Sequence, residues 1–147
     1  FFVNRLPFFL TYSQRICFTS VNHLAGRLTK TIFTAYHEIH YFYLKRGFHI
    51  TTLNVDGEVA PLQVPLQSMP GGPKVNLTSA NEHVPEIERR IRVVKERARS
   101  FQHSLPFNRI PKLLTTHIVF VAVKVLNHFP PQGGISDPIS PKTITTG

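Results

Sequence analysis

The sequence from Val84 to Arg99 reads Val84-Pro85-Glu86-Ile87-Glu88-Arg89-Arg90-Ile91-Arg92-Val93-Val94-Lys95-Glu96-Arg97-Ala98-Arg99. Its apolar residues recur at steps of three and four, and the stripe continues a little further along the chain: Ile87, Ile91, Val94, Ala98, Phe101 and Leu105. This spacing predicts an amphipathic helix whose apolar side lies on a core. Pro85 fits the first turn of that helix, where its missing N–H is not needed.

A second line of residues runs along the helix next to the apolar stripe, each residue directly following an apolar one. It comprises Glu88, Arg92, Lys95 and Arg99. It places one carboxylate near the start of the helix and three cations beyond it on the same side. A metal-dependent enzyme that acts on nucleic acid needs an acid beside such a basic track. The alternative interpretation is a solvated helix face, in which each Glu–Arg pair four residues apart contributes roughly 0.2–0.5 kcal/mol.

The charge balance favours an anionic partner. The chain has 17 basic and 8 acidic residues, which gives a formal net charge of +9. Clustered basic residues favour a phosphate-bearing partner such as nucleic acid, because each neutralised phosphate releases counterions. A membrane surface is the weaker alternative, since the helix has no exposed aromatic face. Six of the 17 basic residues lie in this one helix: Arg89, Arg90, Arg92, Lys95, Arg97 and Arg99.

Length and composition predict one folded domain. The 147 residues are 41% hydrophobic, which is enough for a core. We expect the domain to cover residues 1–131, and a tail rich in Pro, Gly, Ser and Thr to cover residues 132–147 without regular structure. Cys17 is the single cysteine, which excludes a disulfide within the chain.

The sequence predicts neither a membrane segment nor secretion. No apolar run reaches the roughly 20 residues that span a bilayer. The N-terminus has no charged leader before its apolar run, as a signal peptide would have. We therefore expect a nuclear or cytoplasmic protein that is not secreted.

Strands and helices are predicted to alternate along the chain. The apolar run from Leu113 to Phe129 has the composition of a strand but the length of a buried helix, and length favours the helix. The other predicted elements are a hairpin of Phe8–Tyr12 and Ile16–Thr19, a helix from Leu24 to Lys45, a strand from Phe48 to Val55, a Pro-rich loop with at most a short helical turn from Val59 to Lys74, and a short strand around Val75–Leu77.

Asp56 directly follows the predicted strand and precedes Gly57. Folds of the α/β class place catalytic groups at the carboxyl ends of strands. The alternative interpretation is a plain Asp-Gly turn, which is the more common role of this dipeptide.

The element order, with Asp56 ending a strand and Glu88 opening a helix, resembles the integrase catalytic core of copia-type retrotransposons. The family's second carboxylate motif, Asp-Asn-Gly-x-Glu, corresponds to the shorter Asp56-Gly57-Glu58. Its third carboxylate motif corresponds to Glu88-Arg89-Arg90-Ile91-Arg92, continuing to Ala98-Arg99. The segment Ser140–Ile144 resembles the family's closing segment. The resemblance covers most of the chain and implies an α/β fold with a ribonuclease-H-like mixed sheet flanked by helices.

The resemblance implies DNA integration by metal-dependent phosphodiester transfer. In the family, two Asp and one Glu hold a pair of Mg²⁺ or Mn²⁺ ions, and this assigns Asp56 and Glu88 as catalytic residues and metal ligands. It also assigns nucleic-acid contacts along the basic helix, and it is compatible with a homo-oligomer. The candidate contact residues are Arg89, Arg92, Lys95 and Arg99.

Two departures from the family pattern affect the expected activity. The family's first Asp lies on the first strand, ahead of the hairpin, whereas no acidic residue precedes Glu38 in this sequence. The interval from Asp56 to Glu88 is also a few residues shorter than usual and includes the Pro-rich stretch. The resemblance therefore implies a truncated core with an incomplete first strand, and its catalysis should be severely impaired, because losing one ligand of a coupled site costs orders of magnitude in rate.

Two other hypotheses remain open at this point. The net charge of +9 and the same helix also fit a non-catalytic, basic nucleic-acid-binding domain. The incomplete first strand and the Pro-rich interruption also fit a protein-interaction segment or an unfolded remnant.

Overall fold

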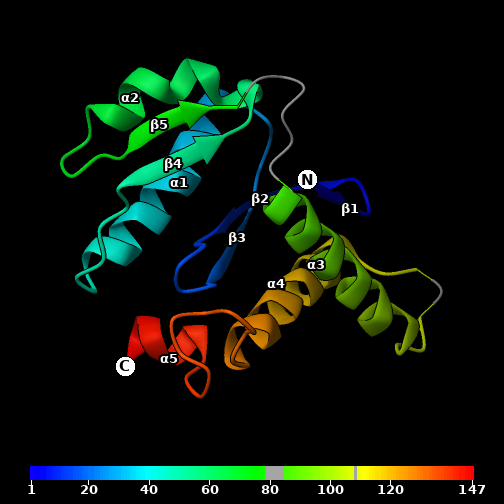
Figure 1. Ribbon diagram of the computed structural model, residues 1–147. Helices are drawn as coiled ribbons and strands as arrows, with labels where there is room; N and C mark the ends of the chain where they lie inside the picture. The colour runs from blue at the N-terminus through cyan, green and yellow to red at the C-terminus, as the bar shows by residue number, and fades with distance from the viewer. Residues whose placement is uncertain (79–84, 108) are drawn as a thin grey trace. The chain divides into compact units, whose positions relative to one another are not determined.

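The computed structural model describes residues 1–78, 85–107 and 109–147. Val84, which opens the stretch quoted above, lies outside the described residues. The described chain divides into two compact units, one formed by Phe1–Leu24 with Glu86–Gly147 and the other by Ala25–Pro85 (Figure 1). We call them unit 1 and unit 2 and describe each by itself.

Unit 1 contains a three-stranded antiparallel sheet in the order β1-β2-β3. Its strands are β1 (Phe2–Val3), β2 (Leu6–Tyr12) and β3 (Thr19–His23). Asn4 and Arg5 join the first two strands with φ angles of 47° and 66°. Two successive positive φ angles match the right-handed twist of a two-residue hairpin turn, which explains the tight connection.

The predicted hairpin is present, but its second strand was placed too early in the sequence. Residues 16–18 belong to the connection, and β3 begins at Thr19, which pairs with Tyr12. The Ser13 N–H donates to the carbonyl of Phe18 at 2.9 Å and closes this connection. Cys17 has a φ of 55°, a left-handed conformation that a strand residue cannot adopt. Strand propensity alone did not reveal this turn.

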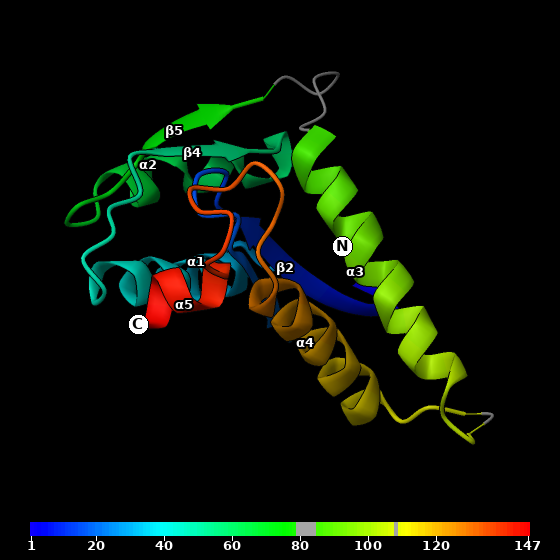
Figure 2. The same cartoon turned by 60° about the horizontal axis from the view of Figure 1, so that its bottom comes forward.

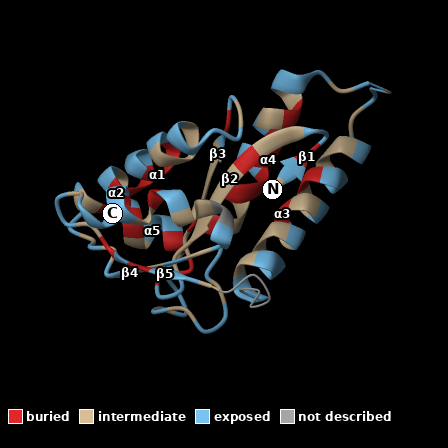
Figure 3. Cartoon of the chain, turned by 90° about the horizontal axis from the view of Figure 1, so that it is seen from above, coloured by how far each residue is buried: buried red, intermediate tan, exposed pale blue. Residues whose placement is uncertain are grey.

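Two long helices cover one side of the unit 1 sheet and confirm two sequence predictions. They are α3 (Pro85–His103) and α4 (Lys112–His128), and the end of α3 lies near the start of α4 (Figure 2). Val94 and Ala98 of α3 are fully buried and pack in one cluster with Phe8 of β2 and with Val119 of α4. The opposite side of α3 is largely exposed (Figure 3). The apolar stripe therefore faces the core, as its spacing predicts.

Asn127 fastens the end of α4 to the sheet. Its side-chain oxygen accepts a hydrogen bond from the backbone N–H of Thr19 at 2.9 Å, and its side-chain nitrogen donates to the carbonyl of the same residue at 2.7 Å. Asn127 and Thr19 are both buried. The amide thus satisfies both backbone groups of one residue at the start of β3, where an unpaired group would be costly.

The C-terminal segment differs from the expected irregular tail, because Pro141–Thr146 forms the short helix α5. Ser140 caps this helix by accepting a hydrogen bond from the N–H of Thr143 at 3.2 Å. Pro141 occupies the first helical position, where proline is favoured. Pro141 and Thr145 are both buried. A capping serine followed by proline is a local signal of a helix start that overall composition obscured.

Unit 2 contains a helix and a two-stranded parallel ladder, β4 (Thr52–Val55) with β5 (Lys74–Leu77). The helix α1 (Thr29–Leu44) is confirmed, but it begins later than the predicted Leu24. Leu24 instead ends the β2–β3 hairpin, where its N–H donates to the carbonyl of Pro7 at 3.0 Å. The strand β4 is likewise shorter than the predicted Phe48–Val55. The short strand β5 confirms the prediction around Val75–Leu77.

The Pro-rich stretch is more helical than predicted. It forms a 3-10 helix, η1 (Gly57–Leu62), followed by α2 (Gln63–Gln67). Pro65 lies in the first turn of α2, where no N–H donor is required. Pro61 lies within η1, a 3-10 helix of six residues. Both helices therefore form although each contains a proline.

The strands form two separate sheets, whereas the sequence predicts one mixed sheet. One sheet is antiparallel and has three strands, and the other is parallel and has two. Mixed α/β structure is confirmed, but the single ribonuclease-H-like sheet is not. β1 consists of only two residues, so it adds only a short edge strand to the antiparallel sheet.

Gly72 is required where the chain turns from α2 into β5. A Cβ atom at this position would lie 2.5 Å from the carbonyl oxygen of Leu66 and 2.9 Å from that of Met69. We expect Gly72→Ala to destabilise the protein by about 1–3 kcal/mol, because backbone must move to admit the methyl group. A thermal melt followed by circular dichroism measures the effect. Gly26→Ala is the control, since nothing lies within 4 Å of its Cβ position, and equal midpoints for both variants would contradict this role.

Candidate functional site

Asp56 lies at the carboxyl end of β4, as the sequence predicts. The carbonyl of Val55, the last residue of β4, accepts hydrogen bonds from the N–H and the hydroxyl of Thr78, each at 3.0 Å. Asp56 then caps η1: its carboxylate accepts from the N–H of Gly57 at 2.6 Å, and its carbonyl accepts from the N–H of Val59 at 2.9 Å. The Asp56 side chain is exposed. A fixed, exposed carboxylate at a strand end can bind a cation from solvent.

Glu88 lies in the first turn of α3, together with Glu86. Both positions suit an acidic residue, because the unpaired N–H groups at a helix start carry partial positive charge. This stabilising role applies to Glu88 whatever its chemical role is. The Glu88 side chain is exposed, so its carboxylate can also meet a ligand in solvent.

The predicted line of acid and cations occupies one side of α3. An open surface hollow of about 290 Å³ is lined by Glu88, Ile91, Arg92, Lys95, Glu96 and Arg99. Three of the four candidate nucleic-acid contacts thus lie together with the candidate metal ligand, and all belong to unit 1. We call this surface the α3 track.

Glu96 is the member of the α3 track that the sequence prediction missed. It lies four residues after Arg92 and three before Arg99, so helical spacing places it beside both. Three cations and two carboxylates therefore line the hollow, and its formal charge is only +1. Periodicity could have revealed Glu96, but the prediction followed only the line that begins at Glu88.

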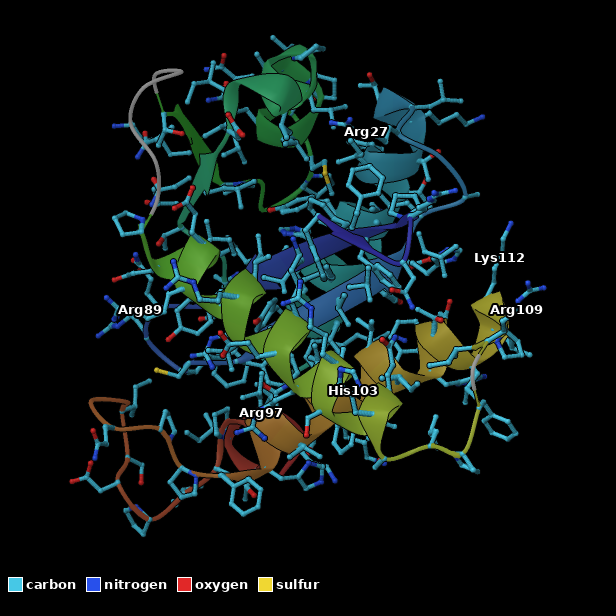
Figure 4. The ribbon with its side chains drawn as sticks, turned by 90° about the vertical axis from the view of Figure 1, so that its right-hand side faces the viewer. Arg27, Arg89, Arg97, His103, Arg109 and Lys112 are labelled. Carbon is cyan, nitrogen blue, oxygen red and sulfur yellow. The ribbon has the colours of Figure 1, made fainter. Side chains whose placement is uncertain are left out.

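The other basic residues of α3 lie outside the hollow. Arg89, the fourth candidate contact, is exposed on α3, and Arg97 lies two turns further along the helix (Figure 4). The guanidinium of Arg90 lies 4.4 Å from the ring centre of Tyr12 on β2, a cation–π contact that occupies this side chain. Burial raises the pKa of Tyr12, as does its hydrogen bond with Cys17, while Arg90 opposes the shift. Arg90 therefore supports the packing of α3 on the hairpin.

The two candidate metal ligands belong to different units. Asp56 is in unit 2 and Glu88 is in unit 1, so their joint action on one metal stays a prediction. Among the residues that the structure describes, no group of three or more His, Cys, Asp or Glu side chains gathers as a metal site. No helix in the described part of the chain has the length and hydrophobicity to span a membrane.

Comparison with known proteins supports the fold. No family model matches the sequence, and no curated protein matches it significantly. Among solved structures, the crystal structure of the catalytic core domain of BIV integrase is similar, with a TM-score of 0.61 and 12% sequence identity. The match covers 97% of this chain and 86% of that one. The fold resembles that of an integrase catalytic core.

This likeness confirms the coarser part of the prediction made from sequence. An integrase-like fold was expected from the placement of Asp56 and Glu88, and it is present. At 12% identity, however, the likeness concerns the fold alone. The copia-type origin, the truncation and the roles of individual residues stay predictions.

Proposed function

We propose that this chain is an integrase-like core that binds nucleic acid along the α3 track. The observation that carries the proposal is the gathering of Arg92, Lys95 and Arg99 around one hollow on an exposed helix side. Cations held in a row by a helix can contact successive phosphates, and each contact releases counterions. The net charge of +9 adds a longer-range attraction for a polyanion. The integrase-like fold supports DNA as the partner.

We further propose that Asp56 and Glu88 are ligands for Mg²⁺ or Mn²⁺. Their donor atoms fit, since both ions prefer carboxylate oxygens and both side chains are exposed. When bound, such ions polarise a phosphodiester and stabilise its attacking and leaving oxygens. The protein's part is to hold the carboxylates, Asp56 at a strand end and Glu88 at a helix start, and to position the phosphates by the cations of the α3 track. Each carboxylate by itself is an incomplete metal site, so metal-dependent cleavage by this chain should be weak.

Removing the Glu88 charge tests the metal site. We expect Glu88→Gln to weaken Mn²⁺ binding about tenfold or more. Loss of a residue that only hydrogen-bonds to a metal ligand already costs about that much affinity, and loss of the ligand itself should cost at least as much. Titration calorimetry measures the binding, and Mn²⁺-dependent nicking of a labelled duplex is a second readout. Glu96→Gln is the matched control, with the same charge change on the same hollow.

The catalytic part of the proposal fails if the two variants bind Mn²⁺ equally well, or if the unmodified chain binds none. The second candidate function is then a non-catalytic, basic nucleic-acid-binding domain. The observation that favours it is that no three potential ligands gather within the described residues. It predicts DNA binding that is independent of divalent metal and insensitive to both Glu88→Gln and Asp56→Asn.

A further inference from the structure

We propose that the connection between α3 and α4 binds single-stranded nucleic acid, with the ring of Phe107 stacking on an unpaired base and nearby cations holding the backbone. The inference rests on the proposed nucleic-acid binding and extends it to a second surface with a different substrate preference. We call this surface the α3–α4 tip and define it by His103, Phe107, Arg109 and Lys112. All four residues are exposed.

The sequence around the tip lacks acidic residues. Between Arg97 and Ser136 there is no Asp or Glu, whereas Arg97, Arg99, Arg109, Lys112 and Lys124 all lie in this interval. A typical solvated surface mixes charges of both signs. A long interval of one sign instead complements a polyanion, because Arg109, Lys112 and Lys124 have no carboxylate close to them in the sequence.

The tip continues the α3 track. His103 lies one turn beyond Arg99 on the same side of α3, and both are exposed. The distance from Arg92 to His103 along the helix is roughly 16 Å at about 1.5 Å per residue. A nucleic-acid strand that binds along the α3 track therefore reaches the end of α3, where the connection to α4 begins.

Arg109 and Lys112 lie where α4 starts (Figure 4). The first turn of α4 contains no acidic residue, and no side chain caps it at Pro111. The unpaired N–H groups of that turn add partial positive charge to that of the two cations. The end of unit 1 where both helices meet thus supplies several donors suited to phosphate oxygens.

Phe107 gives the tip its preference for unpaired bases. Its side chain is 55% exposed, although a phenylalanine ring is normally buried. An exposed ring two residues before Arg109 in the sequence matches the pattern of single-strand binding proteins, in which bases stack on aromatic side chains while the backbone follows a positive surface. Bases in a duplex are already stacked and offer no free face, so the ring should contribute to single-strand binding only.

An anionic membrane is the competing partner for a surface of this kind. Besides Phe107, the start of α4 exposes Leu113 at 70%. At the tip itself these two side chains form only a small apolar area, because the other exposed apolar residues of α4, Phe120 and Val121, lie about two turns further along the helix. Interfacial binding needs a whole apolar helix face. The row of cations that joins the tip to the α3 track suits a linear polyanion, whereas binding to a membrane surface does not require it. Nucleic acid is therefore the partner that the observations favour.

The test measures the binding of the full chain to two probes by fluorescence anisotropy, a thymidine single strand of about 12 nucleotides and its duplex with the complementary strand. We expect Phe107→Ala to weaken single-strand binding about tenfold and to leave duplex binding unchanged. Phe107→Tyr should restore single-strand binding, since tyrosine also stacks. Phe129→Ala is the matched control, because Phe129 is 64% exposed and lies outside the tip.

The cations of the tip have a different signature. Arg109→Ala and Lys112→Ala should weaken the binding of both probes, and each should flatten the salt dependence of single-strand affinity by about 0.7 in log–log slope. Lys30→Ala removes an exposed cation at the start of α1 and should change neither quantity.

Three results would overturn the inference: single-strand binding that survives Phe107→Ala, equal loss with Phe129→Ala, or Phe107-dependent binding to phosphatidylserine vesicles without an effect on the single strand. If Phe107→Ala has no effect while loss of Arg92 and Lys95 abolishes duplex binding, this inference fails and the proposed function stands. If the unmodified chain binds neither probe, both fail.

Discussion

Replacing Arg92, Lys95 and Arg99 together by alanine is expected to reduce the affinity for duplex DNA roughly 10²–10³-fold at about 0.1 M salt. Each lost phosphate contact removes about 0.9 from the salt exponent of the binding constant, which is close to a tenfold loss at that salt concentration. The three side chains line one hollow on α3, so they are expected to contact one nucleic-acid backbone together. Fluorescence anisotropy with a labelled duplex measures the change.

The control for this variant removes the same charge elsewhere. Arg15, Lys30 and Lys74 are exposed and lie outside α3, and their joint replacement by alanine also lowers the net charge by three. We expect the control to bind several-fold more weakly at most, since general attraction depends on total charge but specific contacts depend on position. Similar losses in both variants would show that α3 has no special role.

Asn127→Leu is expected to have the largest effect on stability. The Asn127 amide pairs with both the N–H and the carbonyl of Thr19 inside the protein. A leucine, which has the same branching but no polar atoms, leaves both backbone groups buried without partners, at a cost of about 2–5 kcal/mol. For a chain of this length each kcal/mol corresponds to about 2–4 °C, so the melting temperature should fall by roughly 5–15 °C.

A thermal melt in parallel with Gln132→Leu tests the role of Asn127. Gln132 is also an amide, but it is exposed in the segment that follows α4. Its replacement should leave the melting temperature within about 2 °C, because exposed substitutions usually change stability by less than 0.5 kcal/mol. An unchanged melting temperature for Asn127→Leu would contradict the importance of the link between α4 and β3.

Local patterns predicted the long elements correctly. The stripe from Ile87 to Leu105 predicted α3 and its buried face, and the length of the run after Leu113 predicted α4 despite its strand-like composition. These signals extend over many residues, so single exceptions do not hide them. The position of Asp56 after a strand was also predictable, because a strand followed by Asp-Gly is a local feature.

Features set by tertiary structure were not predictable in this way. The start of β3 depends on the left-handed conformation of Cys17, and the link from Asn127 to Thr19 joins residues 108 positions apart. The two separate ladders depend on which strand edges pair, which side-chain alternation does not specify. In the candidate site, periodicity placed the α3 track, whereas the pairing of Asp56 with Glu88 depends on two units of the fold and was inferred only from a resemblance.

A salt titration of duplex DNA binding by the unmodified chain tests the central claim most directly. If Arg92, Lys95 and Arg99 each neutralise a phosphate, the plot of log affinity against log salt concentration should fall with a slope of about −3 or steeper. Replacing any one of the three by alanine should flatten that slope by about one unit. A flat plot, or the absence of binding at about 0.05 M salt, would contradict the assignment of α3 as a nucleic-acid-binding surface.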